Sequence, residues 1–157
     1  MNTEHFNPYN PFTLIREEED VPVFVNELVK NFKNSKTTSQ STQLIEWRDS
    51  LIKAIVYFLY KECAPWEQNF VYFSKLLNSV SFVEILENYQ SPLDIIFEDL
   101  EKIAPTHIAV TQYSIFKQAP AREAATIVAE IMKEMIILGY GTWARTTKDK
   151  ENSVETE

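Results

Sequence analysis

Histidine and cysteine most often supply metal ligands and nucleophiles, and this sequence has few of either. It has two histidines, His5 and His107, and one cysteine, Cys63. Neither histidine follows a glutamate by three residues, as helical di-metal sites require, and a structural zinc site needs more than one cysteine. The spacing therefore predicts no bound metal and no cofactor. A catalytic Cys63–His107 pair stays open as an alternative, because the sequence alone does not place these side chains.

Carboxylates are more plentiful, and several recur at helical spacing. Glu84 and Glu87 are three residues apart, and Glu98 and Asp99 lie in a later apolar-periodic segment. Such acids suit an ordinary solvated helix face, general acid–base catalysis, or contact with a basic protein. The leading hypothesis takes Glu84, Glu87, Glu98 and Asp99 as partner-binding residues and assigns no catalytic residue.

The overall charge narrows the class of partner. The formal net charge is -8, from 15 basic and 23 acidic side chains. Nucleic-acid backbones are held by Lys and Arg that replace counterions, so this charge favours a basic protein partner. Weak binding of single-stranded DNA by the Lys33–Lys53 region and nearby aromatic residues is the alternative. Aromatic residues that stack on bases usually have lysine or arginine between them, and these aromatic residues do not. We therefore assign five of them to the core: Trp47, Trp66, Phe70, Tyr72 and Phe73.

Glycine is scarce, which bears on both fold and chemistry. The only two glycines are Gly139 and Gly141, against 7 prolines. This disfavours a turn-rich β-sandwich or barrel. The phosphate-binding pattern G-x-x-x-x-G-K-[ST] is absent, so we expect no ATP binding and no enzymatic activity.

Apolar residues recur with a helical period, which predicts an all-α fold: a single compact bundle of about six or seven helices. The helix predicted over 43–62 is apolar around most of its circumference, as is typical of a central helix. Ser91, Pro92 and Asp94 supply a cap, a first residue and an acid at the third position of a helix that extends to residue 103. The other helices are predicted over 20–32, 70–80, 82–89, 105–118 and 120–138.

Three segments are expected along the chain. Residues 1–18 form an extended, proline-containing lead-in, residues 19–140 the all-α domain, and residues 141–157 a disordered charged tail. The polar N-terminus shows no signal peptide, and the longest apolar run, 54–60, is too short to cross a bilayer. With one cysteine, the expected location is the reducing cytoplasm.

Four short strings occur in a characteristic order over residues 5–138. Together they resemble the all-α domain of type IV coupling proteins, the TraG-like DNA-transfer ATPases of conjugative elements. No single string is specific, but their order and spacing are moderately so. The strings are Tyr9-Asn10-Pro11-Phe12, Gln68-Asn69-Phe70, Ser91-Pro92-Leu93-Asp94 and Gln112-Tyr113-x-x-Phe116-Lys117.

The resemblance implies a role in DNA transfer. In that family the all-α domain is inserted in a RecA-like motor at the cytoplasmic face of the membrane, where it helps to recognise the relaxase and relaxosome accessory proteins. This chain has Gln118–Glu123 where the family has a Gly-Lys-Thr stretch. The implied role is therefore non-catalytic docking of a relaxase or accessory protein, with the motor and the membrane contact supplied by a parent protein.

Other functions also fit the sequence. The chain could be a stand-alone regulatory interaction protein of a mobile element, or a homo-oligomer that pairs through the apolar stripe over 124–138. An enzyme built on Cys63 or on the acids is a further alternative.

Overall fold

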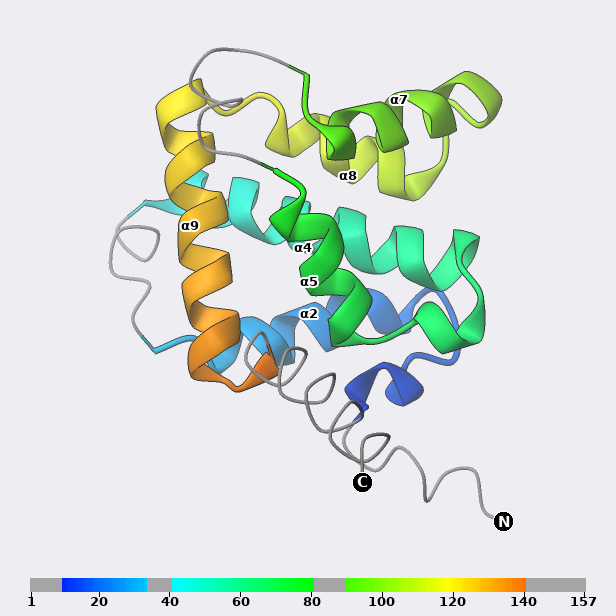
Figure 1. The fold of residues 1–157 in the computed structure, drawn as a ribbon, viewed down its shortest axis with the longest axis horizontal. Coiled ribbons are helices and arrows are strands. Elements are labelled where there is room, and N and C mark those ends of the chain that lie inside the picture. The colour runs from blue at the N-terminus through cyan, green and yellow to red at the C-terminus, as the bar shows by residue number, and fades with distance from the viewer. Residues whose placement is uncertain (1–9, 34–40, 81–89, 141–157) are drawn as a thin grey trace, which may run out of the picture.

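Helices account for all regular secondary structure in the computed structural model, which describes residues 10–33, 41–80 and 90–140. These ranges contain six α-helices, two short 3-10 helices and no strand, so the predicted all-α fold is confirmed (Figure 1). The helix predicted over 82–89 and the tail predicted over 141–157 lie outside the described residues. The elements are η1 (Pro11–Leu14), α2 (Asp20–Lys30), α4 (Thr42–Glu62), η2 (Pro65–Glu67), α5 (Phe70–Asn78), α7 (Pro92–Ile103), α8 (Ile108–Phe116) and α9 (Ala121–Ile137).

Four of the six α-helices begin at a side chain that accepts a hydrogen bond from an otherwise unpaired backbone N–H group. Ser41, Asn69, Ser91 and His107 cap α4, α5, α7 and α8 in this way. At α7 the cap is reciprocal, because Ser91 Oγ accepts from the Asp94 N–H at 3.1 Å and Asp94 Oδ2 accepts from the Ser91 N–H at 3.0 Å. The predicted helix start at Ser91 is confirmed.

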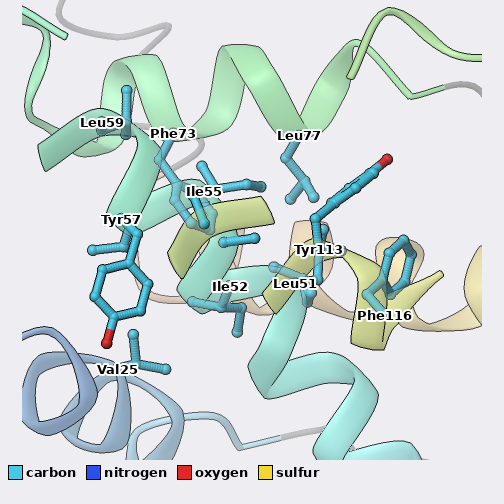
Figure 2. Packing of buried hydrophobic residues seen from close by; sticks show 14 of the residues in the cluster. Val25, Leu51, Ile52, Ile55, Tyr57, Leu59, Phe73, Leu77, Tyr113 and Phe116 are labelled. Atoms are coloured by element: carbon cyan, nitrogen blue, oxygen red, sulfur yellow. The ribbon is translucent and has the colours of Figure 1, made fainter. Parts of the chain in front are cut away.

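The long helix α4 is the centre of the bundle, as its apolar circumference predicts. Leu51, Ile52 and Ile55 are fully buried, and α8 packs along α4 more extensively than any other helix pair. Figure 2 shows these α4 side chains gathered with residues of α5 and α8. Helix α9 runs across one side of the bundle, from the level of α8 to that of α2 (Figure 1).

Residues 10–14, at the start of the described chain, pack against the core as a turn, whereas the sequence predicts an extended segment there. Residues Pro11–Leu14 form a 3-10 turn, and Phe12 is buried. The ring centroid of Phe12 lies 4.9 Å from that of Phe24 in α2 and 4.9 Å from that of Phe70 in α5. Proline sets the backbone of the turn, but burial of Phe12 among other rings holds it against the bundle.

The apolar stripe of α9 is occupied within the chain itself. Ala124, Val128, Ile131 and Met135 are buried in the core, so this stripe is not free to pair two copies. Helix α9 ends at Ile137, and Gly139 two residues later has a φ of 91°, a backbone conformation that suits glycine.

No helix in the described part of the chain combines the length and apolar character needed to span a membrane.

We predict that Phe12→Ala lowers the free energy of unfolding by about 3 kcal/mol, because it leaves a cavity between two aromatic rings. Leu14→Ala is the matched control, since Leu14 is in the same turn but 71% exposed, and we expect a cost below about 0.5 kcal/mol. Urea denaturation measures both. Equal costs for the two variants would mean that the turn is not part of the core.

Candidate functional site

The carboxylate of Asp94 joins α7 to α8. Its Oδ1 accepts a hydrogen bond from the Tyr113 hydroxyl at 2.5 Å and pairs with Lys117 Nζ at 3.0 Å. Its Oδ2 accepts from the Ser91 N–H at 3.0 Å. One carboxylate thus caps its own helix and fixes a tyrosine and a lysine of the next, and charge-assisted bonds of this kind are stronger than neutral ones.

Burial and hydrogen bonding act in opposite directions on this group. Burial raises the pKa of Asp94, but the hydrogen bonds from Tyr113, Ser91 and Lys117 outweigh it and hold the pKa below its ordinary value. The pKa of Tyr113 is raised, first by burial and then by its bond to Asp94. At neutral pH the cluster is therefore an ionised aspartate that accepts from a neutral phenol and an ammonium group.

This junction forms one side of a groove of about 630 Å³ between α7 and α8, called here the α7–α8 groove. Val110 and Tyr113 are buried, and the Phe97 ring beside them stacks on Tyr113 with centroids 4.2 Å apart. Exposed acids and one lysine surround these apolar side chains. The lining residues used below are Asp94, Phe97, Glu98, Glu101, Tyr113 and Lys117.

The four predicted partner-binding acids do not lie together in the described structure. Glu98 lines the α7–α8 groove, whereas Asp99 is exposed elsewhere on α7, 3.8 Å from Lys102. Glu84 and Glu87 lie outside the described residues. Glu101, which was not among the predicted partner-binding acids, also lines the groove.

The strings that carry the family resemblance meet in pairs. Ser91-Pro92-Leu93-Asp94 contacts Gln112-Tyr113-x-x-Phe116-Lys117 through the Asp94 carboxylate. Tyr9-Asn10-Pro11-Phe12 contacts Gln68-Asn69-Phe70, because Asn10 Nδ2 donates to the Gln68 carbonyl at 3.1 Å across 58 residues of sequence. Both pairs fix one part of the bundle against another, so these strings shape the fold.

Cys63 and His107 do not form a catalytic pair in this arrangement. His107 Nδ1 accepts from the Ala109 N–H at 3.0 Å, and His107 Nε2 lies 2.8 Å from Glu62 Oε2. Both ring nitrogens are therefore engaged by groups other than the Cys63 thiol. Burial, together with Glu67 and Glu62, raises the pKa of the Cys63 thiol to about 11, which disfavours the thiolate that a nucleophile requires.

The basic region proposed as a DNA contact is partly internal. Arg48 is 7% exposed, pairs with Asp49 at 2.9 Å and lies over the Phe32 ring at 5.5 Å from its centroid. Its charge is thus directed within the chain. In the ranges described, no three His, Cys, Asp or Glu side chains are grouped as a metal site would need.

The assignment of all five aromatic residues to the core is wrong for Trp66, which is 67% exposed. Its ring meets Tyr72 edge-on with centroids 5.7 Å apart, and Lys75 Nζ lies 4.6 Å from the Tyr72 centroid. Phe70 and Phe73 are buried as predicted. Position in the short turn before α5, not side-chain type, decides the exposure of Trp66.

Comparison with known proteins adds no relative, because no protein family, curated protein or solved structure matches this chain.

We predict that Asp94→Asn lowers the free energy of unfolding at pH 7 by about 2 to 3 kcal/mol, because the amide leaves Tyr113 and Lys117 without a charged acceptor. The folded pKa of Asp94 lies below the unfolded value of about 3.9, so its stabilisation is present above that pH and is lost as pH falls through the folded pKa. Urea titrations should therefore show the difference between the two proteins shrinking as pH falls below the unfolded value of about 3.9. Asp99→Asn, at an exposed site, is the control. A pH-independent gap would contradict the charge-based explanation.

We also predict slow alkylation of Cys63 by iodoacetamide at pH 7.5, with a rate that rises about tenfold per pH unit towards a thiol pKa of about 11. Since Cys63 is the only cysteine, labelling reports on it alone. The urea-unfolded chain is the reference for an ordinary thiol. Folded protein that reacts faster than this reference at neutral pH would restore the nucleophile hypothesis.

Proposed function

We propose that this chain is a non-catalytic recognition module that docks a basic protein through the α7–α8 groove. In terms of the family resemblance, it acts as the all-α domain of a conjugative coupling protein, and its partner is a relaxase or a relaxosome accessory protein. The observation that carries the proposal is the joint placement of Asp94, Glu98 and Glu101 around one groove with a partly apolar lining.

Lys117 supports the assignment of a basic guest. Its ammonium group is 3.0 Å from Asp94 Oδ1, which shows that the groove can hold a positive charge against that carboxylate. The Lys117 side chain is 51% exposed, so water screens this pair and little energy opposes its exchange for a partner's lysine or arginine. Glu98 and Glu101 are exposed and would meet further basic residues at the edge of the groove.

Exposed charges of this kind affect mainly the specificity of binding and the rate of association. Each surface ion pair contributes about 0 to 1 kcal/mol, so several such pairs are needed, because Phe97 and Tyr113 are 3% and 6% exposed and offer a guest little apolar surface. The acids would speed association with a basic partner and disfavour acidic ones. Binding should consequently weaken as salt is raised.

Single-stranded DNA binding is kept as a second candidate because of one observation. Trp66 is exposed and its ring meets Tyr72, over which Lys75 lies. An aromatic pair near a lysine could stack a base and contact a phosphate. The net charge of -8 opposes this function.

The test of the proposed function is capture of the relaxase encoded nearest to this gene, measured by biolayer interferometry at low salt and at about 0.5 M salt. We expect Glu98→Lys to weaken binding about tenfold. Glu46→Lys is the matched control, because it makes the same change in net charge at an exposed position on α4. No capture at low salt, or equal losses for both variants, would overturn docking at the α7–α8 groove.

A parallel titration with a fluorescent oligothymidine of about 30 nucleotides tests the second candidate. We expect no binding at about 0.15 M salt. Binding that Trp66→Ala abolishes and that falls steeply with salt would favour the DNA function instead.

A further inference from the structure

A second groove lies at the opposite end of the bundle from α7, where η1 and α2 meet the end of α9 (Figure 1). Its volume is about 460 Å³. It is called here the α2 groove, and none of its lining residues belongs to the α7–α8 groove. The lining residues used below are Leu14, Asp20, Val23, Phe24, Glu27 and Tyr140.

The α2 groove exposes aliphatic side chains where the fold gives them no internal contact. Leu14 is 71% exposed and Val23 is 63% exposed, while Phe24 beneath them is buried. Tyr140 stacks on Phe70 with ring centroids 4.1 Å apart and forms part of the same wall. Covering such apolar surface is favourable by about 25 cal/mol per Å², so this groove is suited to an apolar guest.

Acids border this apolar surface. Asp20 and Glu27 of α2 line the groove, and the run Glu17, Glu18 and Glu19 precedes it. Glu27 pairs with Lys30 at 3.2 Å, but both side chains are about two-thirds exposed, so solvent screens that pair. The charge complementary to the border is therefore positive.

The backbone hydrogen bonds around the groove indicate which secondary structure a bound partner segment would have. The groove is built from a 3-10 turn and helices whose backbone groups bond within their own elements, so it offers no strand edge to a partner. A partner must therefore be recognised through its side chains. An amphipathic helix fits this requirement, because it carries an apolar stripe with charged residues beside it. We propose that the α2 groove binds a basic amphipathic helix of a partner protein, with aliphatic or aromatic residues against Leu14, Val23 and Phe24.

The acidic border of the α2 groove disfavours two other occupants, an anionic lipid surface and a second copy of this chain. An anionic lipid surface would meet Asp20 and Glu27 and be repelled. A second copy of this chain would place acid against acid, at a net charge of -8 on each molecule. This inference goes beyond the proposed function, because it concerns different residues and would stand if the α7–α8 groove bound nothing.

The experiment uses the full chain and a synthetic helical peptide of about 18 leucine and lysine residues with one tryptophan on the apolar face. The protein's own tryptophans would mask the fluorescence of the peptide tryptophan. The peptide therefore carries a fluorescein label, and binding is followed by the anisotropy of that label. We expect binding that Leu14→Lys and Val23→Lys each weaken at least about tenfold, because they place a charge in the apolar contact. Ile103→Lys is the control, since Ile103 is 80% exposed on α7 and makes the same change in charge.

Because the three substituted side chains are exposed, all variants should keep the thermal midpoint of the parent, which is measured first. Equal peptide binding by Leu14→Lys and the control, or loss only in Glu98→Lys, would overturn the assignment to the α2 groove. So would equal binding of a peptide with glutamate for lysine, binding to anionic vesicles but not to the peptide, or a doubling of molecular mass that Leu14→Lys reverses.

Discussion

The bond between the Asp94 carboxylate and the Tyr113 hydroxyl is the interaction on which the α7–α8 region depends. It joins two consecutive helices, together with the stacking of Phe97 on Tyr113 and the short turn between residues 103 and 108. Because the same carboxylate caps α7, the start of one helix and the position of the next are set by one group.

Much of the helix pattern could be predicted because its determinants are local. Ser91, Pro92 and Asp94 act within one turn, and the apolar stripe of α4 records burial directly in the sequence. Local signals also mislead: an acid at Asp20 could cap α2, but Asp20 is the first residue of that helix and accepts from the Arg16 N–H at 2.9 Å. A short acid can close either the turn before it or the helix after it, and tertiary packing selects between them.

The candidate site was harder to predict because it is assembled across sequence distance. Nothing in a single string indicates that Lys117 would reach Asp94 or that Asn10 would bond to Gln68. The exposure of Trp66 was missed for a related reason, since an aromatic side chain in a connecting turn can lie on either side of it. The useful signal lay in the four strings taken together, which mark the positions where distant segments touch.

The two grooves lie at opposite ends of the bundle, and each has acidic residues at its border and apolar residues in its lining. A module with this arrangement could hold two basic elements of one partner, or one element of each of two partners, without their colliding. The central helix α4 separates the two surfaces with a closely packed core. Linked binding of this kind raises the apparent affinity through effective concentration, even when each contact is weak.

Nuclear magnetic resonance of the labelled chain, during titration with the proposed relaxase partner, tests docking at the α7–α8 groove most directly. The account predicts that the backbone amide signals that shift first belong to the residues around Asp94, Glu98 and Lys117, and that added salt reverses the shifts. Shifts confined to the surroundings of Trp66 and Tyr72, or no shifts at low salt, would contradict it.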